Sequence, residues 1–327
     1  MHYRDLGNTG VKVSAVSFGA WAIGGTWGAV DDREAMAALH AALDNGVTMF
    51  DTADVYGDGR SERLLAQLRR ERREPFFIAT KAGRRLAPHV AGGYTKQNLD
   101  AFLDRSLRNL NVETIDLLQL HCPPTQVYYT PAVFDALEDF HRTGKIRFAG
   151  VSVEKVEEGL KAIEFPVVRS VQIIFNMFRQ RPAELFFREA ARRGVGIIVR
   201  LPLSSGMLTG KFSRSSTFAR DDHRRFNRAG EAFDRGETFS GVPFEHGLDV
   251  VERLRGVVPD GGTLTRMALR WILMFPEVSC VIPGGKTPSQ VEENTGAADL
   301  PPLAPDVMAR IREIYDVDIR PHVHHLW

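Results

Sequence analysis

The fold is indicated most clearly by the segment from Ile115 to Val151, which reads IDLLQLHCPPTQVYYTPAVFDALEDFHRTGKIRFAGV. Its two ends, residues 115–120 and 146–151, are short apolar runs of the kind expected for strands that are buried on both faces. Between them, residues 131–142 show the spacing of apolar side chains that is typical of an amphipathic helix. A strand, a helix and a second strand in this order favour a parallel sheet.

The same alternation extends over the rest of the chain. Further strands are expected at residues 15–19, 48–51, 76–80, 170–173, 196–199 and 279–282, and further helices near residues 31–45, 62–71, 95–109, 153–163, 182–193, 263–275 and 288–297. Eight strands, each followed by a helix, predict an α/β fold with one domain over residues 1–327, a (β/α)8 TIM barrel. A doubly wound open sheet is the structural competitor.

Three other segments stand outside this repeat. Residues 3–6 and 11–13 flank Gly7-Asn8-Thr9-Gly10, a turn sequence that predicts an N-terminal β-hairpin. Residues 304–315 predict an extra C-terminal helix, and the tail 320–327 is expected to be irregular. The polar stretch 213–242 predicts a long loop that is either a lid or disordered.

Composition narrows the possible functions. Lys and Arg total 42 against 41 Asp and Glu, a net charge of +1, which gives no support to nucleic-acid binding. The chain shows no secretory signal and no run of about 18 apolar residues that could span a membrane, so a cytoplasmic protein is expected. Cys122 and Cys280 are expected to be buried thiols. No metal site is predicted, because His322, His324 and His325 match no closed set of ligands and are interpreted as a surface tail.

Four unlike titratable side chains follow three consecutive strands. Asp51 closes the second predicted strand, with Tyr56 in the loop after it, and Lys81 and His121 follow the next two strands. In a barrel, chemistry occurs where strands end and loops begin. Taken alone, His121 would more often be a core histidine whose hydrogen bonds are made within the protein. Taken alone, Lys81 would usually be a solvated surface charge. Four such groups on one face favour a catalytic site.

This set suits the reduction of a carbonyl group, which needs a hydride at carbon and a proton at oxygen. An unperturbed tyrosine has a pKa of ~10, and the Lys81 cation is predicted to lower the pKa of Tyr56. Asp51 would hold Lys81 in place. His121 would hydrogen-bond the carbonyl oxygen, orient the substrate and share in proton transfer.

Three segments resemble the aldo-keto reductase superfamily. They are Phe50–Gly57 (FDTADVYG), Ala79–Lys81 (ATK) and Leu118–Pro123 (LQLHCP), and they look like the family's catalytic tetrad. The resemblance covers nearly the whole chain and indicates a bacterial branch. It implies an enzyme, an NAD(P)H-dependent oxidoreductase that reduces an aldehyde or ketone, or oxidises an alcohol or sugar, with a hydride from nicotinamide and a proton from Tyr56. The alternative is an NADP(H)-binding redox sensor or regulatory subunit, as the potassium-channel β-subunits of this family are.

The resemblance also implies how a cofactor is held, extended across the barrel mouth. The implied contacts are Ser152 and Gln172 at the nicotinamide carboxamide, Arg200 at the nicotinamide ring, Leu203, Ser205, Gly206 and Lys211 at the pyrophosphate, Gly284 and Lys286 at the adenosine phosphate, and Gln290, Glu293 and Asn294 at the adenine. Lys286 precedes a helix N-terminus at Pro288 and would pair with a 2′-phosphate, so NADP(H) is predicted over NAD(H).

Two positions depart from the family pattern. Val153 replaces the usual Asn, and Arg200 replaces an aromatic residue that stacks on the nicotinamide ring. The guanidinium is also planar, but its charge should favour a different redox balance.

Aromatic residues indicate a substrate pocket. Trp21, Trp27 and Tyr94 fall on the first and third predicted βα loops and suggest a pocket for a small aldehyde, ketone or sugar, with ordinary loop packing as the alternative. The long loop 213–242 could fold over cofactor or substrate. Its arginines, Arg220, Arg224, Arg225 and Arg228, could equally form a solvated face.

Overall fold

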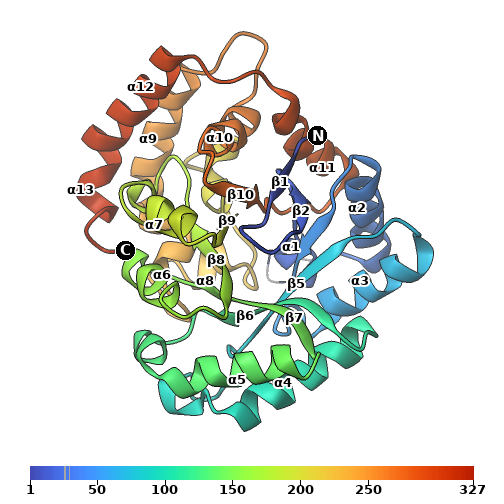
Figure 1. Cartoon of the computed structure of the whole chain (residues 1–327). Helices are drawn as coiled ribbons and strands as arrows, with labels where there is room; N and C mark the ends of the chain where they lie inside the picture. The colour runs from blue at the N-terminus through green and yellow to red at the C-terminus, as the bar shows by residue number, and fades with distance from the viewer. Residues whose placement is uncertain (26, 29) are drawn as a thin grey trace.

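The barrel predicted from the strand–helix alternation is present in the computed structural model, which describes residues 1–25, 27–28 and 30–327 (Figure 1). Within these ranges, eight parallel strands pair in chain order. They are β3 Phe18–Gly19, β4 Met49–Asp51, β5 Phe77–Ala82, β6 Ile115–His121, β7 Ile146–Ser152, β8 Val168–Ile174, β9 Gly196–Arg200 and β10 Val278–Val281. Each predicted strand is therefore confirmed.

The first and last strands meet and close the sheet. Parallel bridges join Val16 to Val281 and Gly19 to Gly284, and the Gly19 amide donates to the Pro283 carbonyl at 3.0 Å. A Cβ atom on Gly19 would lie 2.6 Å from the Ile282 carbonyl oxygen, so this approach requires glycine. Because the sheet closes on itself, the open doubly wound alternative is wrong.

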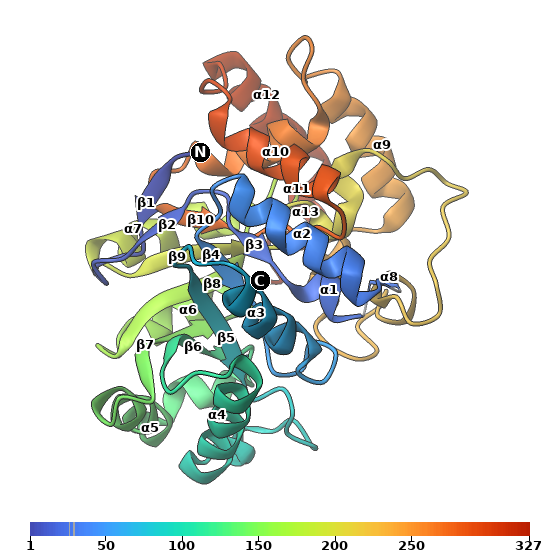
Figure 2. The ribbon, with the colours of Figure 1, turned by 90° about the vertical axis from the view of Figure 1, so that its right-hand side faces the viewer.

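Helices surround the barrel (Figures 1 and 2). Those that follow strands are α1 Trp21–Gly24, α2 Asp32–Asp44, α3 Arg60–Glu71, α4 Lys96–Leu110, α5 Pro131–Arg142, α6 Val156–Ala162, α7 Phe186–Arg192, α8 His223–Phe226, α9 Phe244–Arg255, α10 Leu264–Leu273 and α11 Pro288–Thr295. The start of α2 is fixed by Asp31, whose side chain accepts from the Glu34 amide at 2.7 Å. The predicted C-terminal helix is α12 Pro305–Ile314.

Two segments differ from the sequence prediction. Helix α9 was not predicted, although Phe244, Leu248 and Val251 have helical spacing and are buried. The tail expected to be irregular instead continues through a π-helical turn, Tyr315–Ile319, into α13 Arg320–Val323. Trp327 is buried, and its indole donates to Asp234 at 2.9 Å, so the tail packs against the long loop after β9.

The N-terminal hairpin closes one end of the barrel. Its strands are β1 Tyr3–Asp5 and β2 Lys12–Ser14. Leu6 and Val13 are fully buried in a cluster with side chains of β4, β5, β6, β9 and β10. The Arg4 guanidinium donates to the carbonyls of Leu273, Phe275 and Val278 at 2.6–3.1 Å. Figure 2 shows the hairpin and α8 at opposite ends of the barrel, which leaves the end near α8 for a site.

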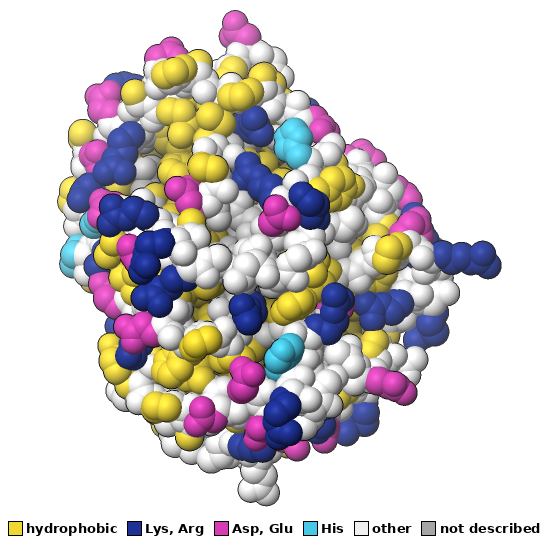
Figure 3. Space-filling model, in the orientation of Figure 1, with side chains coloured by type: hydrophobic (Ala, Val, Ile, Leu, Met, Phe, Trp, Pro, Cys, Tyr) yellow, Lys and Arg dark blue, Asp and Glu magenta, His cyan; other side chains and the backbone are white. Residues whose placement is uncertain are grey.

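The surface seen in Figure 3 is mixed in charge. Basic and acidic side chains are interspersed over this face of the molecule, in keeping with the net charge of +1. No helix within the described ranges combines the length and apolar character needed to cross a membrane.

Candidate active site

The four titratable side chains singled out in the sequence meet at the carboxyl ends of the strands. Lys81 Nζ lies 2.6 Å from Asp51 Oδ2 and 3.3 Å from the Tyr56 hydroxyl. A third bond runs from Lys81 Nζ to the Thr52 carbonyl at 2.8 Å. The rings of Tyr56 and His121 are nearly perpendicular, with centroids 5.9 Å apart. Acid, amine, phenol and imidazole therefore form one group.

The Lys81 ammonium is buried and stays charged. Its side chain is 1% exposed, and burial by itself would lower the pKa of Lys81. Asp51 and Tyr56 outweigh that effect, so the pKa of Lys81 is raised. A permanent cation thus lies next to the phenol of Tyr56.

The predicted direction of the Tyr56 shift is wrong in this structure. Burial raises the pKa of Tyr56 and outweighs the Lys81 cation, which lowers it, while Asp51 adds to the raising effect. The prediction considered the neighbouring charge but not the loss of water around the phenol. The Tyr56 hydroxyl is consequently protonated at neutral pH.

His121 is a neutral imidazole. Burial places the pKa of His121 well below its usual value, and the charges of Arg84 and Lys81 lower it further. Within the described part of the chain, Nδ1 of this buried ring has no hydrogen-bond partner. A neutral ring offers one N–H donor, so His121 can hydrogen-bond an oxygen in the cleft but does not act as a cationic acid.

Two amide side chains hold Asp51. Gln172 Nε2 donates to Asp51 Oδ1 at 2.6 Å, and Gln119 Nε2 donates to the same oxygen at 3.2 Å. Gln119 was missed in the sequence, although a polar residue within the apolar strand β6 was a signal. Ser152 is fully buried, and its hydroxyl donates to Gln172 Oε1 at 3.4 Å.

A cleft of ≈ 440 Å³ begins at this group and extends to the loop before α11. Its walls include the predicted residues Trp21, Trp27, Asp51, Tyr56, His121, Gln172, Arg200, Leu203, Ser205, Gly206, Lys211, Gly284, Lys286, Gln290, Glu293 and Asn294. Of the described residues, the predicted Lys81, Ser152 and Tyr94 are not on its wall. Phe212, Arg224, Glu237 and Thr265 line it but were not predicted as site residues.

Aromatic side chains cover the end of the cleft at Tyr56 and His121. Trp21 stacks on Tyr56, with ring centroids 6.0 Å apart, and Trp27 meets the edge of Trp21 at 5.3 Å. Tyr94 lies away from the cleft, buried with its hydroxyl 2.8 Å from His89 Nε2. The two tryptophans therefore form the aromatic wall, to which Tyr94 does not contribute.

The long loop 213–242 folds over this wall as a lid. His223, at the start of α8, contacts the rings of Trp27 and Trp21 at centroid distances of 4.4 and 4.8 Å. The Arg224 guanidinium lies over the Trp27 ring at 4.9 Å and is bonded to Asp222. Arg224 lines the cleft, whereas Arg220, Arg225 and Arg228 are exposed, as the solvated-face alternative expected.

The outer half of the cleft fits an anionic dinucleotide. Three cationic side chains, Lys211, Arg224 and Lys286, line it. Lys286 Nζ donates to the Trp27 carbonyl, and its backbone amide donates to Gln290 Oε1 at 2.8 Å. Helix α11 begins behind them with Pro288 in its first turn, so its N-terminal end adds to the positive potential.

Comparisons with known proteins show what the chain is similar to. Residues 15–316 match the family model described as the aldo/keto reductase family. The chain is 28% identical to aldo-keto reductase YhdN of Bacillus subtilis, over 89% of this chain and 87% of that protein. It is 30% identical to a probable voltage-gated potassium channel subunit beta of Arabidopsis thaliana, over 96% of each chain. The glycerol dehydrogenase AKR11B4 structure from Gluconobacter oxydans superimposes with a TM-score of 0.78 at 27% identity, covering 98% and 96% of the two chains.

Proposed function

We propose, since the chain belongs to the aldo/keto reductase family, that it reduces a small aldehyde, ketone or sugar with NADPH and uses Tyr56 as the proton donor. Members of this family are oxidoreductases that use nicotinamide cofactors and act on carbonyl or sugar substrates. The observation that carries the proposal is the contact of the Tyr56 hydroxyl with the buried Lys81 ammonium, at the bottom of the cleft.

The bound cofactor would supply the hydride. Tyr56 and His121 both face the catalytic end of the cleft, so a carbonyl oxygen beside them would accept hydrogen bonds from the phenol and the imidazole. The proton on the Tyr56 oxygen passes to the substrate oxygen, and the Lys81 ammonium stabilises the phenolate left behind. Asp51 neutralises Lys81 and is itself fixed by two glutamine amides.

The residues lining the cleft suggest how the cofactor is held. We assign Gln172 and Arg200 to the nicotinamide, with Ser152 acting through Gln172. Leu203, Ser205, Gly206 and Lys211 would contact the pyrophosphate, Gly284 and Lys286 the adenosine phosphate, and Gln290, Glu293 and Asn294 the adenine. Lys286 is the reason for preferring NADPH, because its ammonium matches a 2′-phosphate. Trp21 and Trp27 would contact the substrate.

Steady-state kinetics tests both parts of the proposal. NADPH oxidation is followed with a panel of sugars, hydroxy-aldehydes, pyridoxal and quinones, and the Michaelis constants of NADPH and NADH are compared. We expect the NADPH value to be lower by about tenfold or more, and Lys286→Met to remove most of that difference. Equal values for the two cofactors in the unmodified chain would contradict the NADPH assignment.

Tyr56→Phe tests the proton donor. The variant should lose most of the reductase activity, a factor of about 10² to 10⁴, because it lacks the transferred proton. Its dissociation constant for NADPH should stay within a few fold, because only one hydroxyl is removed. Turnover at the unmodified rate would refute the role of Tyr56.

A regulatory role is the second candidate function. It is favoured by the 30% identity with the Arabidopsis potassium channel subunit, which extends over 96% of both chains. On this alternative, the chain would bind NADPH and act as a redox sensor for a partner. Tight NADPH binding without turnover of any carbonyl in the panel would favour this role over the enzyme.

A further inference from the structure

The side chain of Trp327 packs against one end of the lid. It is 5% exposed, and its indole N–H donates to Asp234 Oδ1 at 2.9 Å. The Arg179 guanidinium lies over the indole ring at 4.0 Å. Asp234 begins two short helical turns that end at Gly241, and we call residues 234–241 the inner turn of the lid. In the described part of the chain, the wall of the cleft does not include Trp327, so this residue contacts the lid without contacting the cleft.

The inner turn is shaped to accept this ring. A Cβ atom on Gly241 would lie 2.4 Å from the Trp327 ring, and a Cβ atom on Gly236 would lie 2.9 Å from it. Phe239 and Ser240 have φ angles of +51° and +58°, which residues other than glycine rarely adopt. Such a backbone persists only where the surrounding structure holds it. The contact with Trp327 is one of the restraints that hold the inner turn.

The tail that carries Trp327 is anchored outside the lid. Nδ1 of His324 lies 2.7 Å from the Tyr315 hydroxyl, and Nε2 of the same ring lies 3.2 Å from Glu184 Oε2. Val323 is buried. Because these contacts do not involve residues 213–242, Trp327 offers the lid a surface whose position is fixed independently.

On its other side, the inner turn carries Glu237 into a buried ionic cluster, which consists of Arg84, Glu154, Arg200 and Glu237. The Arg200 guanidinium lies 2.8 Å from Glu154 Oε2 and 3.4 Å from Glu237 Oε2. Arg84 lies 3.0 Å from Glu154 Oε1 and is also paired with Glu237. Each carboxyl group is thus shared between the same two guanidinium groups.

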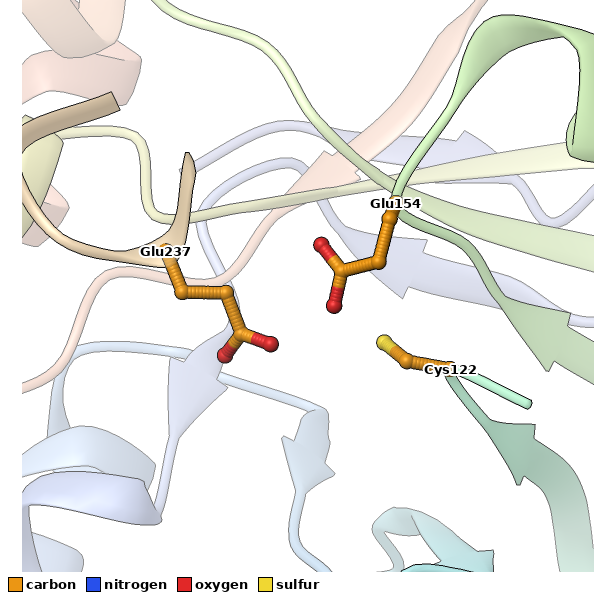
Figure 4. Close-up of side chains that lie close together, drawn as sticks. All are labelled: Cys122, Glu154 and Glu237. Atoms are coloured by element: carbon orange, nitrogen blue, oxygen red, sulfur yellow. The ribbon is translucent and has the colours of Figure 1, made fainter. Parts of the chain in front are cut away.

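The carboxyl groups of this ionic cluster also face a thiol. Figure 4 shows the Glu237 carboxyl group pointing toward Glu154 and Cys122. One donor atom from each of these three residues lies within 4.8 Å of the others, a grouping that could suit a metal ion. Both carboxyl groups are already paired with arginines, however. We therefore treat the group as a set of ion pairs that fixes Glu237.

The inner turn contacts two residues that we assign to the cofactor, Arg200 and Ser205. Arg200 is paired with the Glu237 carboxyl group. The Ser205 hydroxyl donates to the Glu237 carbonyl at 2.9 Å and accepts from the Phe239 amide at 3.1 Å. Arg200, Ser205 and Glu237 all line the cleft. A displacement of the inner turn would therefore change the part of the wall where the cofactor is expected.

We propose that Trp327 is a positioning residue that slows the release of the nicotinamide cofactor. Its ring and its N–H group hold the inner turn against the ionic cluster, and the inner turn in turn holds Arg200 and Ser205 in place. Trp327 acts on the cofactor only through these residues. The inference rests on the proposed function, in which the cofactor occupies this cleft, and it adds a role that neither the catalytic group nor Lys286 accounts for.

Stopped-flow fluorescence of the full chain measures the release directly. The protein is loaded with NADPH and mixed with excess NADP⁺, and the loss of the fluorescence of bound NADPH gives its dissociation rate constant. The nicotinamide is excited directly, so that the tryptophans do not contribute to the signal. Trp327→Ala should raise this rate constant about tenfold, because a hydrogen bond to a carboxylate and a cation–π contact are both lost.

Trp271→Phe is the matched control. Trp271 is also a buried tryptophan, but it packs on Phe175 and Phe275, and within the described ranges it is not on the wall of the cleft. The variant should lower the Tm while the rate of NADPH release stays within twofold of the unmodified value. Equal acceleration of release in Trp271→Phe and Trp327→Ala would show a general loss of stability and would overturn the inference.

Substitutions of Asp234 provide a second test, which does not depend on the folding of the Trp327 variant. Asp234→Ala removes the acceptor of the indole N–H and of the Gly236 amide, and it should speed NADPH release about fivefold. Asp234→Asn keeps an acceptor oxygen and should release NADPH within twofold of the unmodified rate. If Asp234→Asn releases NADPH as fast as Asp234→Ala, the hydrogen bond to Trp327 does not hold the inner turn, and the inference is overturned.

The outcomes separate the two proposals. If NADPH does not bind the unmodified chain, the proposed function fails and this inference fails with it. If NADPH binds and Trp327→Ala releases it within twofold of the unmodified rate, only the inference is overturned.

Discussion

Two buried ionic groups share the barrel mouth, and they are built in different ways. The Lys81–Asp51 pair joins residues at the ends of neighbouring strands, β4 and β5. The ionic cluster of Arg84, Glu154, Arg200 and Glu237 joins the end of strand β9 to three loops. Arg84 and Glu237 are 153 positions apart in the chain. Strand ends meet because the sheet is regular, whereas Glu237 reaches the two arginines only because the long loop folds back. The first arrangement follows from the barrel architecture, and the second depends on how the loops fold.

The two groups should also differ in what they control. The Lys81–Asp51 pair contacts the proposed proton donor, so its loss should affect the chemical step. The ionic cluster ties the lid to the wall of the cleft, so its loss should affect stability and binding. Substitutions in each group test this distinction.

The largest effect is expected from Lys81→Met. We expect kcat to fall about 10³-fold, because the phenolate of Tyr56 loses its neighbouring cation and Asp51 is left buried without its partner. NADPH affinity, measured by titration, should change by less than about threefold, because Lys81 does not line the cleft. Lys145→Met removes a lysine that is paired with Asp100 and Asp104 far from the cleft, and serves as the control. A kcat within tenfold of the unmodified value would contradict the distinction.

Glu237→Gln should mainly destabilise the fold. The variant leaves Arg84 and Arg200 buried with one carboxylate fewer, which costs about 3 kcal/mol in the free energy of unfolding. Urea denaturation measures this loss. Glu231→Gln, on the exposed part of the same loop, should cost less than about 0.5 kcal/mol. Equal losses in the two variants would show that the cluster does not stabilise the lid.

Asp54→Asn tests a buried carboxyl group that belongs to neither set. Burial raises the pKa of Asp54 to about 7, with Glu62 adding to the shift, and neither oxygen has a hydrogen-bond partner in the described ranges. The folded state keeps a proton that the unfolded state releases above about pH 4, so stability is lost as pH rises from about 4 to 7. Asparagine cannot ionise. Relative to the unmodified chain, Asp54→Asn should therefore be about 4 kcal/mol more stable at pH 8 than it is at pH 4.

Thermal denaturation across that pH range measures the difference. A constant gap in Tm between Asp54→Asn and the unmodified chain would mean that Asp54 does not titrate in the folded state between pH 4 and 8.

The smallest effect is expected from Ser205→Ala. The Ser205 hydroxyl donates to the Glu237 carbonyl at 2.9 Å and accepts from the Phe239 amide at 3.1 Å, which ties the lid to the cleft wall. Removing this hydroxyl should destabilise the closed loop by about 1 kcal/mol. The population of the open loop should therefore increase roughly fivefold. Limited proteolysis at residues 213–242 measures that opening. Ser215→Ala, whose hydroxyl is exposed, is the control, and equal cleavage of the two variants would argue against the tie.

Much of the barrel and of the candidate site could be predicted from the sequence. The eight strands follow from apolar runs that alternate with helical patterns, because strands covered on both faces must be apolar along their length. The rule that polar side chains at strand ends converge placed Asp51, Lys81 and His121 together. Local signals were present even where they were missed, as in the helical spacing of α9 and the buried polar Gln119.

The contacts between loops and the depth of burial of the site residues depend on the tertiary structure. Glu237 reaches Arg84, Arg224 reaches Trp27, and Trp327 reaches Asp234 through contacts between distant loops, which no local periodicity encodes. The pKa of Tyr56 rises, although its neighbour Lys81 alone would lower it, because removal of water depends on every atom that surrounds the phenol. A sequence thus determines which groups are available and which strands present them. The folded loops decide how deeply those groups are buried and which charges face them.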